Sequence, residues 1–223
     1  MKKIGLIVAV EDEALQQKYG EGYNLQDGHG TVLYQTRQCQ VYALHSGAGE
    51  IFAASATQYL IDRYEVATVL NYGVVGACME ELRTGETCIV ERVVYHQYDI
   101  SAVDGVPLGR YLEYPEVWLP VNKELLSKAS AACSGLRLVT CASGDKFMDD
   151  PAEKLRLYKE FGADICDMEA AAILLTCDLN RVPCLFIKTV SDGVRGGASE
   201  YWSEKDQTAR TCLDIVAQII DEL

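Results

Sequence analysis

The chain has 223 residues, 49% of them hydrophobic, and its 33 acidic and 20 basic side chains give a formal net charge of −13. A chain of this size can bury a full core, and we expect one α/β domain spanning residues 1–223. The acidic surface repels phosphate backbones and anionic membranes, so we expect no nucleic-acid partner and no membrane partner. A small neutral or zwitterionic ligand is compatible with this charge.

The N-terminus runs directly into the strand-like stretch "KIGLIVAV", with acids behind it, whereas a signal peptide would need a longer apolar core. The nine cysteines form no C-x-x-C pair, a pattern that predicts reduced core thiols and a cytoplasmic protein. The three histidines, His29, His45 and His96, lie far apart in sequence and show no metal-ligand spacing. We expect no metal site.

Apolar, β-branched runs alternate with helical periodicity along the chain, which predicts a mostly parallel sheet covered by helices on both faces. The predicted strands are 3–9, 31–37 and 39–47 as an antiparallel hairpin, 66–75, 86–96, 136–144, 163–169 and 183–192. Residues 97–120 hold three of the five prolines and many aromatic side chains without a clear period. This segment therefore predicts a long, ordered loop.

Two stretches show the three-and-four spacing of packing helices. The apolar residues of 50–65 that lie on overlapping faces are Ile51, Ala54, Tyr59 and Ile61. The core stripe of 203–222 is Ala209, Cys212, Leu213, Val216, Ile219 and Ile220.

Acids follow several of the predicted strands, at the edge where open α/β sheets bind their ligands. The loops "VAVEDEA", "DMEA" and "VSDG" deliver Glu13, Glu169 and Asp192 to that edge. The stretch "ADICDMEAAAILL" also keeps Asp167 in a run with a buried pattern, where an ionised carboxylate is costly unless a charge or hydrogen bond meets it. The pattern predicts a cluster of acids at the mouth of the sheet.

Each acid also has a purely structural interpretation. Asp192 precedes a glycine, and Asp-Gly is a common turn pair. Glu13 could complement a helix dipole together with Glu11 and Asp12. Glu169 could cap the helix that begins at "AAAILL". The residues alone leave these interpretations open.

In this order, the segments "IGLIVAVEDEA", "SGAGEIFAA", "NYGVVGAC", "SGDKFM", "DMEAAAI" and "IKTVSD" resemble the nucleoside phosphorylase superfamily, and within it the methylthioadenosine/S-adenosylhomocysteine nucleosidases. The similarity covers nearly the whole chain. It implies a single nucleoside phosphorylase-like domain, with a twisted mixed central sheet flanked by helices on both faces. It also implies a homodimer in which a loop of one subunit closes the pocket of the other, and 97–120 is the candidate loop.

The resemblance implies a hydrolase, without a cofactor, that cleaves the N-glycosidic bond of a 5′-modified adenine nucleoside. Methylthioadenosine, S-adenosylhomocysteine and 5′-deoxyadenosine are the expected substrates, and a futalosine-type nucleoside is also compatible. Asp192 would be the general acid that protonates N7 of adenine, and Glu13 the base that activates water. Glu169 would accept hydrogen bonds from the ribose hydroxyls.

The other implied contacts bind the base and the sugar. Met168 would pack against the ribose, Phe147 would stack on adenine, and the backbone of Phe147 and Met148 would read the edge of the base. The remaining implied binding residues are Ala9, Val74 and Ser191. Taken singly, Met168 and Phe147 also fit ordinary core positions.

Several residues depart from the common nucleosidase pattern. Val74 replaces a hydroxyl side chain, Ala48 a larger apolar residue, and Glu50 a lysine, which affects the expected substrate more than the reaction. Tyr201 or Trp202 is the expected lid over the 5′ substituent.

Two other functions remain open at the level of sequence. A nucleoside phosphorylase would need cations for phosphate, and Arg195 is the candidate, although the acidic "EDE" stretch would repel a phosphate. A nucleoside-binding protein without turnover is the third hypothesis, but it would not need an acid and a base together.

Overall fold

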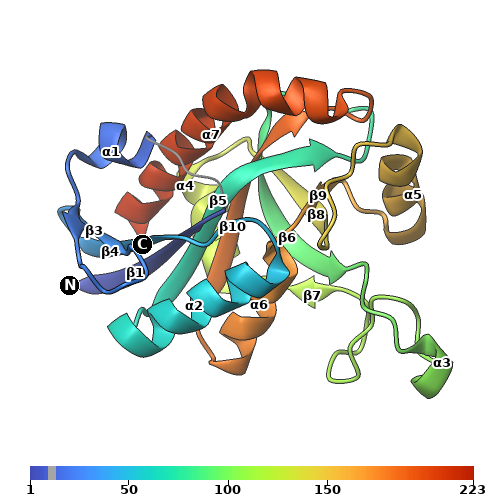
Figure 1. Ribbon diagram of the computed structural model, residues 1–223, viewed down its shortest axis with the longest axis horizontal. Helices are drawn as coiled ribbons and strands as arrows, with labels where there is room; N and C mark the ends of the chain where they lie inside the picture. Colours follow the sequence, from blue (N-terminus) through green and yellow to red (C-terminus); the bar gives the residue numbers. More distant parts are fainter. Residues whose placement is uncertain (10–13) are drawn as a thin grey trace.

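The structure is a computed structural model that describes residues 1–9 and 14–223, and it has a mixed sheet with helices on both faces (Figure 1). The strands are β1 (Lys2–Val8), β2 (Tyr23–Asn24), β3 (Val32–Gln35), β4 (Cys39–His45), β5 (Thr68–Ala77), β6 (Thr87–Tyr95), β7 (Leu119–Pro120), β8 (Arg137–Ser143), β9 (Ile165–Asp167) and β10 (Cys184–Asp192). The helices are α1 (Ala14–Tyr19), α2 (Glu50–Tyr64), α3 (Ser101–Asp104), α4 (Lys123–Ala132), α5 (Pro151–Phe161), α6 (Ala170–Leu179) and α7 (Gly197–Glu222). The predicted fold class is confirmed.

Strand β10 closes part of the sheet because it pairs with two strands that are otherwise far apart. It runs parallel to β5 and antiparallel to β6. The pairing continues from β6 through β8 and β9 back to β5, and β1, β4, β3 and β2 extend the sheet from β5. The predicted hairpin is confirmed by the antiparallel pair β3 and β4, in which Val32 lies opposite Ala43.

Helix α7 contacts α1 and α4 on one side of the sheet, and α2 contacts α6 on the other (Figure 1). The predicted stripe of α7 is buried, except for the half-buried Ala209. The helix begins at Gly197, earlier than the predicted residue 203. The Glu200 carboxylate accepts a hydrogen bond from the Gly193 N–H at 2.9 Å, which ties the glycine-rich turn to the first turn of α7.

The buried face of α2 differs from the prediction. Ile51 is 79% exposed, and the other three predicted residues are only half-buried. The apolar residues that are buried instead are Ala53, Ala56 and Leu60. Helix α2 lies close to the sheet: a Cβ at Gly5 of β1 would lie 3.2 Å from Leu60 Cδ1. Apolar spacing alone did not distinguish the two faces, because large apolar side chains occupy the outer one.

The segment 97–120 is ordered, as predicted, and contains α3 and β7. The rings of Tyr98 and Tyr111 stack with their centroids 3.9 Å apart, and the Gly109 N–H donates to the Tyr98 carbonyl at 2.7 Å. The nine cysteines are buried free thiols, also as predicted. Across the described ranges, no helix has the length and apolar character needed to span a membrane.

Candidate active site

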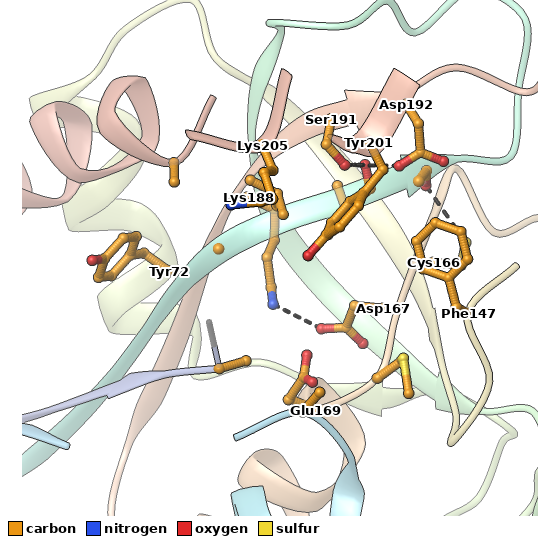
Figure 2. Close-up of a pocket in the computed structure, with 18 of the residues that line it drawn as sticks. Tyr72, Phe147, Cys166, Asp167, Glu169, Lys188, Ser191, Asp192, Tyr201 and Lys205 are labelled. Carbon is orange, nitrogen blue, oxygen red and sulfur yellow. Dashed lines mark hydrogen bonds and ion pairs between the residues drawn. The ribbon is translucent and has the colours of Figure 1, made fainter. Parts of the chain in front are cut away.

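A cavity opens where β1, β5, β9 and β10 end, beside the first turns of α7 (Figure 2). Every predicted site residue that the structure describes lines this cavity, namely Ala9, Val74, Phe147, Met148, Met168, Glu169, Ser191 and Asp192. The predicted base Glu13 lies outside the described residues, as do Glu11 and Asp12. Strand ends that are far apart in sequence thus converge on one site.

The cavity has an aromatic wall. The rings of Phe147 and Tyr201 meet edge to face, with centroids 5.3 Å apart and an interplanar angle of 71°. Phe147 is 39% exposed, and Met148 beside it is buried. Of the two candidate lid residues, Tyr201 lines the cavity, whereas Trp202 does not and is 69% exposed.

A buried ion pair lies in the cavity between Asp167, at the end of β9, and Lys188 in β10 (Figure 2). The Lys188 Nζ and Asp167 Oδ2 atoms are 2.8 Å apart, and each side chain is 1% exposed. Burial alone would raise the pKa of Asp167, but the charge and hydrogen bond of Lys188 outweigh it and hold the pKa below its usual value. The sequence analysis noted Asp167 but missed Lys188. Its signal was a lone lysine inside the apolar run "CLFIKTV".

Two more carboxylic acids, Glu169 and Glu50, lie close enough to Asp167 for its charge to affect their ionisation. Burial, and then the negative charge of Asp167, raises the pKa of Glu169 to about 7 and that of Glu50 to about 8. Glu169 accepts a hydrogen bond from the Gly49 N–H at 3.0 Å. It occupies the N-cap position of α6, but its side chain does not cap that helix. Its carboxylate instead lines the cavity.

Glu50, at the position where the resemblance led us to expect a lysine, is buried. Its carboxylate accepts hydrogen bonds from the Ser143 hydroxyl and from the Ala172 N–H, each at 2.6 Å. It is only 5% exposed, and its hydrogen bond to the Ala172 N–H links the start of α2 to the start of α6.

Asp192 lies at the end of β10, apart from Asp167 and Glu169 in the cavity (Figure 2). Its Oδ1 accepts a hydrogen bond from the Ser191 hydroxyl at 2.7 Å, and its Oδ2 forms an ion pair with Lys154 of α5. Burial raises the pKa of the Asp192 carboxyl, while the hydrogen bond and charge of Lys154 oppose that rise. The sequence analysis also missed Lys154. Its only signal is the spacing of three residues from Leu157, which is buried on the same helix.

The cations around the cavity are already engaged. Arg195, the candidate phosphate ligand, is 75% exposed, pairs with Glu80 at 3.2 Å and does not line the cavity. The three lysines that line it pair with acids: Lys146 with Glu153, Lys188 with Asp167, and Lys205 with Asp206. These pairs offset the positive charge that a phosphate dianion would need.

The fold and this cavity define a class of protein. The family model described as "Phosphorylase superfamily" matches residues 3–223. The chain therefore belongs to the phosphorylase superfamily, and its curated relatives assign it within that superfamily to the 5′-methylthioadenosine/S-adenosylhomocysteine nucleosidase family.

Among these relatives, the 5′-methylthioadenosine/S-adenosylhomocysteine nucleosidase of Hydrogenovibrio crunogenus is 31% identical over 200 residues, which cover 85% of each chain. The aminodeoxyfutalosine nucleosidase of Campylobacter jejuni is 27% identical over 199 residues, which cover 86% of each chain. The chain is also similar to a solved structure of the Helicobacter pylori 5′-methylthioadenosine/S-adenosylhomocysteine nucleosidase in complex with a 4-amino-5H-pyrrolo[3,2-d]pyrimidine compound. That match has a TM-score of 0.90 and 25% identity, and it covers 100% of this chain and 99% of the other.

The raised pKa of Glu50 predicts a pH-dependent stability. The folded chain holds a proton on Glu50 up to about pH 8, whereas the unfolded chain loses it near the ordinary value of 4.5. The resulting stabilisation is complete below about pH 4.5 and is lost as the pH rises through about 8. Relative to Glu50→Gln, the free energy of unfolding of the wild type should therefore fall over this range in urea titrations. Glu65→Gln, at the exposed end of α2, is the matched control. A wild-type-minus-Glu50→Gln difference that does not change with pH would contradict the prediction.

Proposed function

We propose that the chain is a hydrolase that cleaves the N-glycosidic bond of a 5′-modified adenine nucleoside, releasing adenine and a ribose derivative. The observation that carries the proposal is the placement of Asp192 and Glu169 in one cavity that also holds the aromatic wall. The names of the relatives, which are nucleosidases, support the same reaction.

The proposed chemistry assigns one task to each acid. Cleavage develops positive charge on the ribose, and adenine leaves readily only when a proton reaches its ring. Asp192 delivers that proton to N7, and Glu169 accepts hydrogen bonds from the ribose hydroxyls and provides negative charge near the developing cation. Glu13 activates the attacking water. Because the pKa of Glu169 is about 7, its ionisation, and with it sugar binding, changes near neutral pH.

The other side chains of the cavity fit the two halves of a nucleoside. Phe147 offers a ring face or edge to the base, and the backbone beside Met148 reads its Watson–Crick edge. Met168 packs its thioether against the ribose. Val74 and Ala9 contribute apolar surface, and Ser191 orients Asp192. Tyr201 lies on α7, where it can cover a 5′ substituent.

The substrates that we propose are methylthioadenosine, S-adenosylhomocysteine and 5′-deoxyadenosine. An aminodeoxyfutalosine-like nucleoside is a variant of the same proposal, since one relative is named for that substrate. A cytoplasmic location is also proposed, because nine free thiols suit a reducing compartment.

Purified protein should release adenine from at least one of these nucleosides, and the rate should not depend on phosphate. The reason is that the lysines of the cavity are paired with acids. Adenine release is followed by chromatography with and without phosphate, together with assay of free ribose derivative against ribose 1-phosphate. Release that requires phosphate would identify a phosphorylase, and tight nucleoside binding without release would identify a binding protein.

Replacing the proposed acid should separate turnover from binding. Asp192→Asn removes the carboxyl group that delivers the proton while the shape is kept, so kcat should fall by about 10²- to 10⁴-fold with little change in nucleoside affinity. Turnover and equilibrium binding are measured on the same preparation. Full activity in this variant would rule out Asp192 as the proton donor.

A homodimer is the proposed assembly. Large apolar side chains are exposed on α2 and in the segment 97–120, including Ile51 at 79%, Phe52 at 61%, Val103 at 85% and Leu112 at 54%. Sedimentation should show a dimer that dissociates on Ile51→Asp, because a buried unpaired charge is costly. Tyr23→Asp, at a residue that is 72% exposed on β2, should not affect assembly. A monomeric wild type would refute this proposal.

A further inference from the structure

Lys154 is a buried lysine whose ammonium group lies against the proposed acid. It sits in the first turns of α5, and its side chain is 0% exposed. Its Nζ donates one hydrogen bond to Asp192 Oδ2 and another, at 2.8 Å, to the Gly193 carbonyl. A lysine is rarely buried this completely without a partner of opposite charge, and here Asp192 is that partner.

The surrounding chain leaves room for this pair. A Cβ at Gly76 would lie 3.2 Å from Asp192 Oδ2 and 3.3 Å from Lys154 Cε, closer than neighbouring side chains normally allow. Gly76 and Asp192 both line the cavity, and Lys154 lies behind them. A side chain at this point of β5 would crowd the pair, which glycine avoids.

The hydrogen bonds to Asp192 make it difficult for this residue to act alone as the proton donor. Its two oxygens accept from the Ser191 hydroxyl and from the Lys154 ammonium. Burial raises the pKa of Asp192, but these donors oppose that rise, and the buried Lys154 ammonium has its counter-charge only when Asp192 is ionised. A carboxylate that is ionised at rest holds no proton to give to a leaving base, whereas the ammonium beside it does.

We propose that the acid of this enzyme is the buried Lys154–Asp192 pair, in which Lys154 stores the proton and Asp192 passes it to the leaving base. This inference rests on the proposed function and assigns a role to a residue that does not line the cavity.

The proton balance is complete within the site and the water. As the C1′–N9 bond breaks, its electron pair moves onto the purine. An Nζ–H bond of Lys154 breaks as an O–H bond forms on Asp192, and that O–H bond breaks as N7–H forms. Water adds hydroxide to C1′ and gives its proton to the base Glu13. After the products leave, Glu13 releases its proton to solvent and the neutral amine of Lys154 takes one up, which restores the starting state.

The first test compares leaving groups in Lys154→Met. A carboxylic acid loses its proton at a lower pH than an ammonium, so activity on the adenine nucleoside should decline at lower pH in the variant than in the wild type. At about pH 8 we expect kcat to fall roughly 10²-fold for this substrate. A 4-nitrophenyl riboside with the same 5′ substituent needs no proton, and its kcat should change less than about 3-fold. Equal losses on both substrates, or an unshifted pH profile, would overturn the inference.

Two control variants separate this effect from damage to the fold. Lys159→Met makes the same change at an exposed position of α5 and should leave both activities intact. The double variant Lys154→Met/Asp192→Asn removes both charges of the pair. If Lys154 acts through Asp192, the double variant should be no slower than Asp192→Asn alone. A further loss in the double variant would show an independent, structural role for Lys154.

The second test needs neither turnover nor a variant. The free base 9-deazaadenine carries a hydrogen at the position of N7, so it donates to an ionised Asp192. Calorimetry at pH 7 in buffers of different ionisation enthalpy should show that the wild type binds this base without releasing a proton. Release of one proton per site, or no binding, would overturn the inference. If no nucleoside is hydrolysed, the proposed function fails, and this measurement still decides the resting state of the pair.

Discussion

Pairing of buried charge is the constraint on which the rest of the site depends. Asp167 and Lys188 lie 2.8 Å apart on strands that do not pair with each other, and both are almost inaccessible to water. Removing either partner would leave an uncompensated charge in a medium that solvates it poorly, at a cost of about 3–5 kcal/mol. The pair therefore requires β9 and β10 to end at the same point in space. The negative charge of Asp167 also contributes to the raised pKa values of Glu169 and Glu50.

A second acid–lysine pair, Asp192 with Lys154, lies elsewhere around the same cavity. The two pairs differ in what surrounds them. Asp167 has the carboxylic acids Glu169 and Glu50 near it, and its negative charge contributes to the raised pKa of both. Asp192 has a lysine and a serine as its nearest polar groups, which suits the movement of a proton. One fold thus places two acid–lysine pairs with different surroundings around one cavity.

The topology explains how residues so distant in sequence serve one cavity. Strand β5 pairs with β1, β9 and β10, so their ends meet along it. Its own residues from Asn71 to Gly76 line the cavity between these ends. Helix α7 contributes Tyr201 to the cavity lining, and Glu50 at the start of α2 is hydrogen-bonded to the start of α6. A substrate bound here would contact elements from nearly the whole length of the chain, which couples its binding to the complete fold.

The sequence by itself determined the alternation of strands and helices, the hairpin, the core stripe of α7 and the acids Glu169 and Asp192 at strand ends. These features depend on local periodicity and on motifs that are contiguous in the chain.

Only the tertiary structure decided which charges meet. Lys188 is 21 residues from Asp167 and Lys154 is 38 from Asp192, so their pairing follows from strand register and helix placement. The exposed Ile51 reversed the expectation for the start of α2. The buried face there is formed by small alanines and by Glu50, which is held by hydrogen bonds from Ser143 and Ala172. Periodicity defines the faces of a helix, but the elements that it packs against determine which face is buried.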